Sequence, residues 1–390
     1  MIRTLHIDIE GGYGGSSRSL YELVRRLDRD RFAPLVVHRR EGPIAGRYAE
    51  IDIPTAHVPE IFSYAPRPRN SGKIFLANLP GLPALRRGVA RIAALAREHG
   101  AAVIHLNYEG LFLMAGPLRR ATGLPLVGHS RTLIPENPWG RWVVRSLARQ
   151  VAHMFFITTR EAERFAALAP RTRPPGDVMW NIATPAACAA DPVKTEIPEA
   201  IFLGNHDVTK APDRMLDIAA ALDARNAPPL KLVIYGSART NRDYGRMLAD
   251  RIDRENLGHR VSLAGHIADP EAATARAFAL IRPSRDNDPW GRDVIEAVSA
   301  GVPVLATGSY DKVVEPGVNG YLFEPFDAGA MADRLLDLLA RPDLRRRMHA
   351  AGREKGARQF GGTDQAALAS RVFAAVAGHS TDSSNGTQTT

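Results

Sequence analysis

Cysteine is almost absent from this chain. Its 390 residues include one cysteine, Cys188, which excludes a disulfide framework and any zinc or iron–sulfur site built from cysteines. Long apolar runs are absent as well, because the most apolar window, residues 111–118, is too short to cross a bilayer. The first residues lead into a charged strand rather than into the apolar core of a signal peptide. We therefore expect a cytoplasmic protein whose membrane contacts, where it makes them, are peripheral.

Lysine is scarce, with 6 lysines against 45 arginines, and the positive charge is unevenly distributed. The formal net charge is +9; residues 1–190 carry +11 and the other residues carry −2. This asymmetry indicates either two domains with different partners or compositional drift. A basic half would be attracted to an anionic membrane surface or to nucleic acid. Because the arginine pairs here are rarely interleaved with aromatic residues, we expect no nucleic-acid partner.

Short apolar runs alternate with amphipathic helical patterns along the whole chain. This alternation is typical of parallel sheets covered on both faces, and it predicts an α/β fold with doubly wound domains. At about 150 residues per domain, the length favours two such domains. The expected strands are residues 4–9, 33–38, 102–106, 124–129, 154–158, 200–203, 230–235, 260–264, 277–282, 302–307 and 320–323. The expected helices include residues 18–27, 85–99, 213–224, 243–255, 292–299 and 328–339.

The domain boundaries follow from the place where this pattern pauses. Residues 186–199 carry prolines and small residues without periodicity, and we interpret them as a linker. The first domain is then expected over residues 1–185 and the second over residues 200–378. The polar residues 379–390 are expected to form a disordered tail. Residues 60–83, which carry prolines and basic residues, are expected to form a long functional loop.

A glycine-rich turn follows the first expected strand. Residues 11–17 read Gly-Gly-Tyr-Gly-Gly-Ser-Ser and precede a helix. Glycines at such a position let backbone amides approach an anion, and the amino end of a helix favours negative charge. Ser17 stands in place of the third glycine of the dinucleotide-binding fingerprint, which argues against a nicotinamide cofactor. Gly14 and Gly15 are therefore candidate phosphate contacts, and a plain flexible turn is the alternative.

The segment over residues 284–297 is the richest in polar and turn-forming residues. It follows an expected strand and opens a helix, with Asp288 before the helix start and Glu296 inside it. Carboxylates placed in this way can accept hydrogen bonds from several hydroxyls, which suits a sugar or a ribose. Arg292, in the first turn, can face an anion. The alternative is an acidic capping cluster on an exposed helix.

This segment resembles the carboxylate signature of the retaining glycosyltransferases of family four, of the type that assembles bacterial glycans. Residues 288–291, Asp-Pro-Trp-Gly, stand where the family shows Glu-Pro-Phe-Gly, and Glu296 matches the second glutamate. Residues 300–307 and 314–323 are similar to the strand and turn patterns that follow in the family. The resemblance implies the GT-B fold, in which two Rossmann-like domains face each other across a cleft. The first domain would bind the acceptor and the second the nucleotide-sugar donor, and the last helix would pack back on the first domain.

The resemblance also implies roles for individual residues. Asp288 would approach the hydroxyls of the donor sugar, Glu296 would bind the ribose, and Lys210 would hold the donor diphosphate. His129 would lie near the donor sugar, and His105 is a rival for that position. The expected catalytic residues are therefore His129, Lys210, Asp288 and Glu296.

Further donor contacts are implied in the turns that follow the strands. The arginine that usually accompanies the family's lysine is replaced by Asn205, and Arg292 or a basic residue of the first domain would compensate. The other implied donor-binding residues are Gly14, Gly15, Gly236, His266, Trp290 and Gly291.

The reaction implied is the transfer of a sugar from a nucleotide-diphosphate donor to an acceptor hydroxyl with retention. In this fold, retention is commonly described as attack from the face that the leaving group occupies, with the donor phosphate assisting deprotonation. Asp288 and Glu296 are therefore not assigned as a glycosidase-like acid/base pair. Basic side chains would stabilise the leaving diphosphate, so we expect neither a metal nor another cofactor.

The acceptor is expected to be a glycan of the cell envelope or an exopolysaccharide. The basic first half favours an anionic, lipid-linked form of it at the inner membrane face. Two alternatives stay open. One is a nucleotide-sugar epimerase or phosphorylase-like enzyme of the same fold. The other is a non-catalytic sugar-binding protein, which Asp288 and Asn205 favour because both depart from the family pattern.

Overall fold

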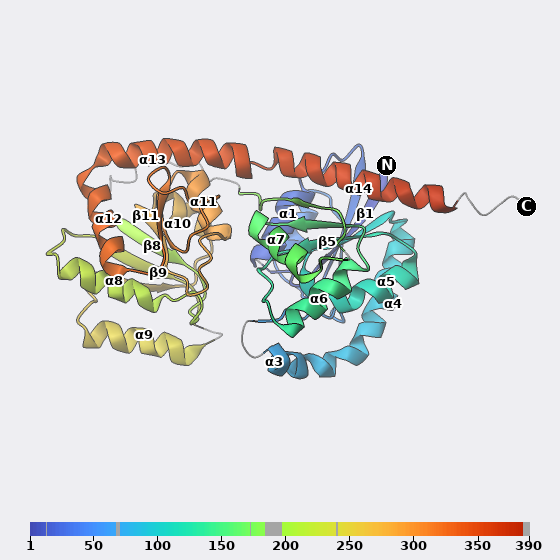
Figure 1. The fold of residues 1–390 in the computed structure, drawn as a ribbon, viewed down its shortest axis with the longest axis horizontal. Coiled ribbons are helices and arrows are strands. Elements are labelled where there is room, and N and C mark those ends of the chain that lie inside the picture. Colours follow the sequence, from blue (N-terminus) through green and yellow to red (C-terminus); the bar gives the residue numbers. More distant parts are fainter. Residues whose placement is uncertain (13, 68–70, 172, 184–196, 239–240, 385–390) are drawn as a thin grey trace, which may run out of the picture. The chain divides into compact units, whose positions relative to one another are not determined.

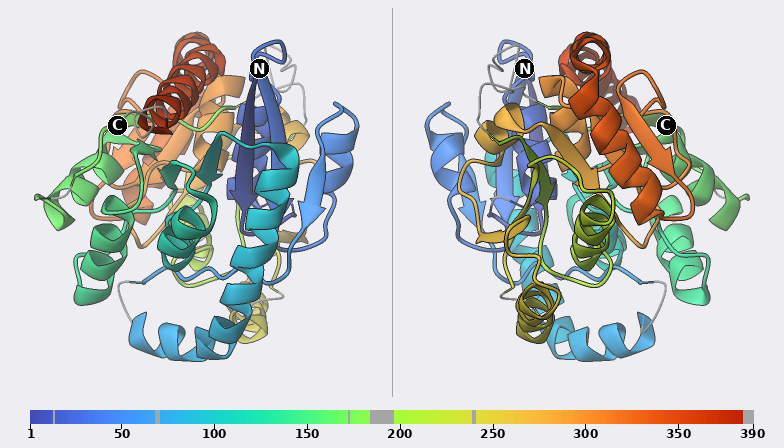
Figure 2. Two further views of the ribbon diagram at one scale, coloured as in Figure 1. Left: turned by 90° about the vertical axis from the view of Figure 1, so that its right-hand side faces the viewer. Right: turned by 90° about the vertical axis from the view of Figure 1, so that its left-hand side faces the viewer.

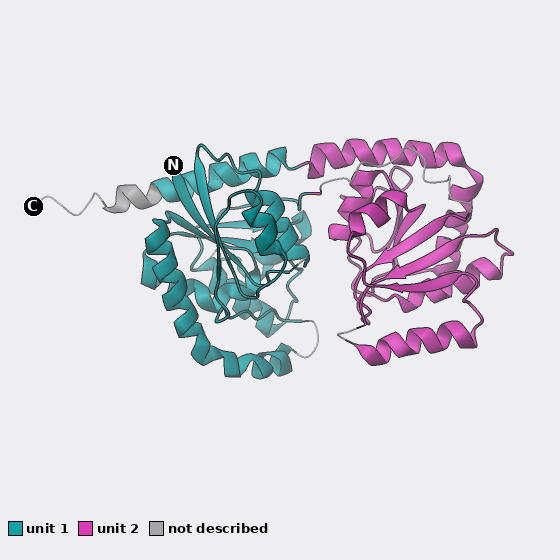
Figure 3. Cartoon of the chain, turned by 180° about the vertical axis from the view of Figure 1, so that it is seen from behind, with its two compact units in different colours: residues 1–182, 362–390 teal, residues 183–361 magenta. Residues whose placement is uncertain are grey.

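The computed structural model describes residues 1–12, 14–67, 71–171, 173–183, 197–238 and 241–384, and their side chains as far as residue 378. These residues form two compact units, which Figure 3 shows in different colours. Unit 1 comprises residues 1–182 and 362–390, and unit 2 comprises residues 183–361. Each unit has a parallel sheet of its own, so the prediction of an α/β fold with two Rossmann-like domains is confirmed.

Unit 1 is built on a seven-stranded parallel sheet with the order β3-β2-β1-β4-β5-β6-β7. Helices α4, α5 and α6 pack on one face, and α1 and α14 pack on the other. The strands are β1 (Ile2–Asp8), β2 (Phe32–His38), β3 (Thr55–His57), β4 (Val103–Leu106), β5 (Leu126–Ser130), β6 (His153–Phe156) and β7 (Gly176–Val178). The helices are α1 (Gly15–Val24), α2 (Ile44–Ala49), α3 (Ser71–Asn78), α4 (Leu82–His99), α5 (Phe112–Thr122), α6 (Pro138–Ala148), α7 (Thr159–Leu168) and α14 (Thr363–Ser384), with short 3-10 turns η1 (Leu79–Gly81) and η2 (Glu109–Leu111).

Unit 2 is built on a six-stranded parallel sheet with the order β10-β9-β8-β11-β12-β13. Helix α8 packs against α12, and α11 packs against α13. The strands are β8 (Glu199–Leu203), β9 (Lys231–Tyr235), β10 (Val261–Gly265), β11 (Ala279–Arg282), β12 (Val304–Thr307) and β13 (Gly320–Phe323). The helices are α8 (Asp213–Asp223), α9 (Arg242–Arg254), α10 (Pro270–Arg276), α11 (Arg292–Ala300), α12 (Ala328–Ala340) and α13 (Pro342–Lys355), followed by the π-helical turn η4 (Gly356–Phe360).

The predicted strands all lie within two residues of strands in the structure, because each is a short and mostly apolar run. The short strands β3 and β7 were not predicted. Both are three residues long and lie at the two edges of the unit 1 sheet, where none of their residues is fully buried. An edge strand of this kind carries too little apolar pattern to be recognised.

The prediction of one long loop over residues 60–83 was wrong. Helix α3 begins at Ser71, η1 follows it, and α4 begins at Leu82, so that α3 and α4 form one bent arm along unit 1 (Figures 1 and 2). Proline suggested a loop here, but Pro80 and Pro83 occupy the first turns of η1 and α4. A proline is tolerated there because the first amides of a helix have no partner within it.

The second domain ends earlier than expected, at residue 361 rather than 378. The implied packing of the last helix on the first domain is confirmed, because α14 belongs to unit 1, where Phe373 is fully buried against Phe155 and the residues around it. The expected tail over residues 379–390 was also wrong in its first part, because α14 continues to Ser384. Polar residues have only modestly lower helix propensity, so polarity alone does not end a helix.

Residues 385–390, and residues 186–196 of the expected linker, lie outside the described part of the chain. Strand β8 begins at Glu199.

Within the part of the chain that the structure describes, no helix combines the length and the apolar character needed to span a membrane.

Candidate functional site

The motif residues of unit 2 lie at one edge of its sheet. Strands β8 and β11 are parallel neighbours, so the loops that follow them leave from the same edge. Lys210 lies in the first loop and Asp288 in the second. Two hydrogen bonds join these loops: the Ser284 hydroxyl and the Arg285 amide both donate to the carbonyl of Thr209, over 3.0 Å and 2.8 Å. The fold therefore brings Lys210 and Asp288 side by side.

Asp288 lies between two cations. Its Oδ2 accepts a hydrogen bond from Arg282 Nη2 at 2.7 Å, and Lys210 Nζ lies 3.5 Å from the same oxygen. Burial acts to raise the pKa of the Asp288 carboxyl, but Arg282 and Lys210 outweigh it and hold that pKa below its usual range. The other oxygen, Oδ1, is buried and has no hydrogen-bond partner among the described residues. An ionised oxygen of this kind is a strong acceptor for a ligand hydroxyl.

Glu296 lies one turn into α11 and is buried. Its Oε1 is 2.8 Å from Nε of Arg292, with only 10% of the Arg292 side chain and 4% of the Glu296 side chain exposed. Arg292 therefore pairs within its own helix, and its expected contact with an anion stays a prediction. The spacing of four residues places the two side chains on one face, where opposite charges pair.

Trp290 and Gly291 shape the turn before α11. Trp290 is buried and packs edge-on against Tyr310, with ring centroids 5.0 Å apart. A Cβ atom at position 291 would lie 2.7 Å from Asp293 Oδ1 and 3.0 Å from Arg282 Nη1. Only glycine leaves room for these charged groups so close to the start of the helix.

The other predicted donor contacts of unit 2 lie at the ends of β8, β9 and β10. Gly236 has a φ of +153°, and a Cβ there would lie 1.7 Å from the carbonyl oxygen of Gly204. Asn205 and His266 are exposed. His206 is instead buried, and both of its ring nitrogens lack a hydrogen-bond partner among the residues described. Burial lowers the pKa of His206, a residue to which the sequence analysis gave no role.

In unit 1, the predicted glycine pair begins α1. Gly14 is the residue before the helix and Gly15 its first residue. A Cβ on Gly14 would lie 1.8 Å from Glu10 Oε2, whereas the space around Gly15 is open. The stricter need for glycine is at Gly11, where φ is +123° and a Cβ would lie 1.9 Å from the Arg40 carbonyl oxygen. Gly15 therefore keeps an open approach at the positive end of a helix.

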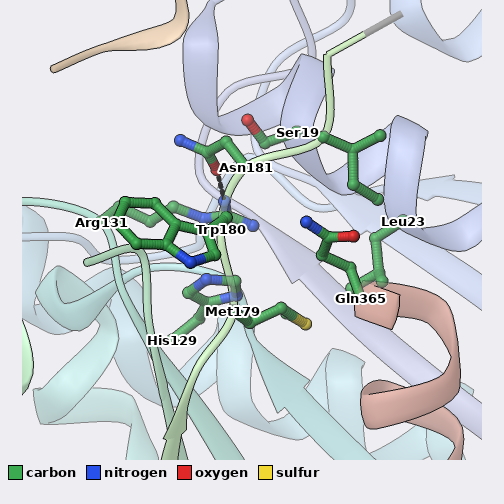
Figure 4. Close-up of a pocket in the computed structure, with 9 residues that line it drawn as sticks. Ser19, Leu23, His129, Arg131, Met179, Trp180, Asn181 and Gln365 are labelled. Carbon is green, nitrogen blue, oxygen red and sulfur yellow. Dashed lines mark hydrogen bonds between the residues drawn. The ribbon is translucent and has the colours of Figure 1, made fainter. Parts of the chain in front are cut away.

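His129 lines a small pocket in unit 1, together with Arg131, Asn181 and Gln365 (Figure 4). The side chain is 1% exposed, and both ring nitrogens lack a hydrogen-bond partner within the described ranges. Burial, reinforced by the charge of Arg131 and by His105, lowers the pKa of His129 well below its usual value. A neutral imidazole offers one donor and one acceptor to a ligand.

Arg131 is the centre of a polar network beside this pocket. Its guanidinium donates to Asn181 Oδ1 at 2.6 Å and to Asn107 Oδ1 at 2.5 Å (Figure 4 shows the first bond). Its backbone amide donates to Glu109 Oε2 at 2.7 Å, and the Thr132 hydroxyl donates to Oε1 of the same residue. Burial raises the pKa of Glu109 to about 7. Sequence reasoning missed this network because its members come from three separate segments.

The buried His6 gives a prediction about pH. The ring is fully buried and hydrogen-bonded to Thr4 Oγ1 at 2.8 Å and His105 Nδ1 at 3.1 Å. Burial, with a smaller effect of His99, lowers the pKa of His6 to about 3. Below pH 6.5 the unfolded chain therefore binds this proton more readily than the folded one, and stability falls with falling pH. Between pH 7 and pH 5, the unfolding free energy of the wild type should therefore fall by about 2 kcal/mol more than that of His6→Gln.

Urea denaturation followed by tryptophan fluorescence measures this difference. Trp139, Trp142 and Trp180 lie in unit 1, so the signal reports mainly on the unit that contains His6. The matched control is His259→Gln in unit 2, where 55% of the side chain is exposed. An equal pH dependence in wild type and His6→Gln would show that His6 does not stay neutral in the folded state.

In the described ranges of the chain, no three histidine, cysteine, aspartate or glutamate side chains are grouped so that they could hold a metal ion.

Two family models match the chain, one in each half. The model described as "Glycosyl transferase 4-like domain" matches residues 14–176. The model described as "Glycosyl transferases group 1" matches residues 189–355. Together they cover the whole unit 2 sheet and most of the unit 1 sheet.

Curated relatives and solved structures agree with these matches. The chain is 29% identical to the D-inositol 3-phosphate glycosyltransferase of Xylanimonas cellulosilytica, over 76% of this chain and 78% of that protein. It is 24% identical to the alpha-D-kanosaminyltransferase of Streptomyces kanamyceticus, over 65% of this chain and 72% of that protein. The crystal structure of Anabaena HepE in complex with UDP has the same fold, with a TM-score of 0.77 and 18% identity over 96% of this chain and 100% of that one. The chain thus belongs to the GT-B glycosyltransferases of the family-four type.

Proposed function

We propose that the chain transfers a sugar from a nucleotide-diphosphate donor to an acceptor hydroxyl, with retention at the anomeric carbon. The observation that carries this proposal is the grouping of Lys210, Asp288 and Glu296 at one edge of the unit 2 sheet. Lys210 would hold the diphosphate and neutralise the charge that develops as it leaves. Asp288 Oδ1 would accept a hydrogen bond from a donor-sugar hydroxyl, and Glu296 would do so from the ribose. The HepE structures with UDP and with UDP-glucose support a nucleotide-sugar donor.

The charges of the site argue against Asp288 as a general acid, and the proposed mechanism uses no protein nucleophile. Arg282 and Lys210 hold Asp288 ionised, so its carboxyl has no proton to give to a leaving group. The acceptor hydroxyl would attack the anomeric carbon as the bond to the diphosphate breaks, and its proton would pass to a phosphate oxygen of the leaving group. The neutral His129 would orient the donor sugar through a hydrogen bond. No metal ion is needed in this scheme, because Lys210 supplies the positive charge.

A donor screen tests the proposal. The purified chain is incubated with UDP-, GDP-, dTDP- and ADP-sugars and a pool of glycan acceptors, with magnesium or with a chelator. Release of the nucleoside diphosphate and an axial-to-axial or equatorial-to-equatorial anomeric outcome, read by NMR, would support retaining transfer. Interconversion of the donor sugar without release would favour the epimerase alternative. Binding without any turnover would favour a sugar-binding protein.

The acceptor is proposed to be an anionic, lipid-linked glycan of the cell envelope. The relative from Xylanimonas is named for D-inositol 3-phosphate, which is an anionic compound. The arm formed by α3, η1 and α4, residues 71–99, carries five basic residues and one acidic residue. On this arm the Leu76 side chain is 62% exposed and that of Leu79 is 36% exposed, and Lys73, Arg86 and Arg87 are exposed as well. Basic and apolar side chains together suit the surface of an anionic bilayer.

Vesicle sedimentation tests this contact. Reversing three charges with Lys73→Glu, Arg86→Glu and Arg87→Glu should weaken binding to phosphatidylglycerol vesicles more than tenfold, at about 1 kcal/mol per basic residue removed. The matched control is the exposed Arg254 in unit 2, where Arg254→Glu should leave binding unchanged. Equal sedimentation with neutral phosphatidylcholine vesicles, or no effect of the triple variant, would contradict an electrostatic contact through this arm.

A further inference from the structure

Arg282 joins three parts of the turn that carries Asp288. It is the last residue of β11, and 6% of it is exposed. Its Nε donates to the backbone carbonyl of Asp288 at 3.1 Å, and its Nη2 donates to Asp288 Oδ2 at 2.7 Å. Its Nη1 lies 2.7 Å and 2.8 Å from the two carboxylate oxygens of Asp293, at the start of α11. One guanidinium thus fixes a carbonyl and two carboxylates, a geometry that lysine cannot reproduce.

This arrangement gives the two carboxylate oxygens of Asp288 different roles. Both cations of the site meet Oδ2, with Arg282 at 2.7 Å and Lys210 at 3.5 Å. Oδ1 is buried and unpartnered among the described residues. Because the guanidinium holds both the carbonyl and Oδ2 of Asp288, the carboxylate cannot rotate to exchange its oxygens. Oδ1 therefore keeps one direction, and a ligand hydroxyl is the kind of group that would satisfy it.

The contacts of Arg282 with Asp288 also determine whether the ammonium of Lys210 is available for an anionic ligand. At 3.5 Å, Lys210 is at the limit of hydrogen bonding to Asp288, and a third of its side chain is exposed. Without Arg282, Asp288 would be an ionised, half-buried carboxylate with Lys210 as its nearest cation. Opposite charges in such surroundings attract strongly, so Lys210 and Asp288 would form a shorter ion pair. The carboxylate would then offset the positive charge of the ammonium. An anionic ligand would then meet a site without a net positive charge.

We propose that Arg282 is a positioning residue for the donor site: it holds Asp288 so that Oδ1 meets a donor-sugar hydroxyl, and it keeps Lys210 available for the diphosphate. This inference rests on the proposed function for the identity of the ligand. It also explains how the chain functions with Asn205 in place of a second cation, because the cation that offsets Asp288 comes from the end of β11. Neither role is visible in the sequence, where Arg282 reads as a strand end.

A double-mutant cycle with a nucleoside diphosphate tests the proposal. UDP, GDP and ADP are titrated into the full-length wild type by calorimetry, and the nucleotide bound most tightly is carried through the cycle. Arg282→Met should weaken binding about tenfold, because Asp288 then captures Lys210. Asp288→Asn should bind the nucleotide within about threefold of wild type, since no carboxylate competes for the lysine. The double variant should return to within about threefold of wild type, a rescue that a merely structural role of Arg282 would not give.

The outcomes separate the two proposals. If the wild type binds none of the three nucleotides, the proposed function fails. If the wild type binds one and Arg282→Met binds it equally well, or if the loss persists in the Asp288→Asn background, the role of Arg282 is overturned. Arg282→Gln, which removes the charge and keeps a polar side chain, replaces Arg282→Met in the cycle, with the same expected outcomes, if the latter does not fold. Arg225→Met, which breaks the surface pair with Asp333 in the same unit, is the matched control and should leave the affinity unchanged.

Discussion

Replacing Lys210 with alanine is expected to lower sugar transfer about 10²- to 10³-fold, because a preorganised cation at a leaving group contributes on that scale. Lys210 lies 3.5 Å from Asp288, and its position in the loop after β8 is fixed by the hydrogen bonds of Thr209 to Ser284 and Arg285. The loss should appear as weaker binding of the nucleoside diphosphate as well as slower turnover. Calorimetry with the diphosphate and initial rates of its release measure the two effects.

A comparison of nucleotides shows whether Lys210 acts on the diphosphate. Lys210→Ala should weaken the binding of the nucleoside diphosphate while changing the binding of the corresponding monophosphate little, because the monophosphate lacks the second phosphate. Lys312→Ala is the matched control, since Lys312 is an exposed lysine of the same unit. Equal losses for mono- and diphosphate would place Lys210 at the nucleoside instead. An unchanged diphosphate affinity would remove Lys210 from the site.

The site residues of unit 2 that the sequence predicted lie in the loops and the helix that follow predicted strands, so the order of these elements along the chain fixes their positions. Lys210 and Asp288 lie in the loops that follow β8 and β11, and Glu296 lies one turn into the helix after the second loop. In a parallel sheet the carboxyl ends of neighbouring strands meet at one edge, so the pattern of strands alone brings these loops together. That part of the site depends only on the order of elements.

The residues that sequence reasoning missed depend on tertiary packing. Arg282 reads as the end of a strand, and only the folded turn shows that it holds Asp288 and Asp293. Glu109 has a pKa of about 7 because it is buried, and burial is a property of the assembled unit rather than of the motif. The pairing of Arg292 with Glu296 also depends on the folded helix, and the expected contact of Arg292 with an anion stays a prediction.

The fold shows the same division between local and tertiary information. Buried strands such as β9 carry a continuous apolar pattern and were placed from it, whereas the edge strands β3 and β7 were not. The prolines of η1 and α4 suggested a loop because their local chemistry fits either a loop or the first turn of a helix. The apolar pattern of α14 does not indicate which sheet it covers; the family resemblance implied the first domain, and the burial of Phe373 in unit 1 confirms it.

Replacing Glu296 with glutamine is expected to remove the preference for ribose over deoxyribose. If the carboxylate accepts hydrogen bonds from the ribose hydroxyls, wild type should bind the nucleoside diphosphate at least about tenfold more tightly than its 2′-deoxy analogue, since charge-assisted hydrogen bonds contribute about 1.5–3 kcal/mol. Glu296→Gln should bind the two nearly equally. Competition titrations with UDP and 2′-deoxy-UDP, or with the pair for the preferred base, measure this ratio.

The same substitution should also destabilise unit 2, and the two effects have to be separated. Glu296→Gln takes the charged partner from Arg292, whose side chain is only 10% exposed, and breaking a buried pair costs about 3–5 kcal/mol. The double variant Arg292→Met/Glu296→Gln removes both charges and should recover most of that stability while the ribose preference stays lost. Glu354→Gln, in the exposed pair with Arg358, is the matched control and should change neither quantity. If the double variant regained the ribose preference along with its stability, Glu296 would support the helix and would not contact the nucleotide.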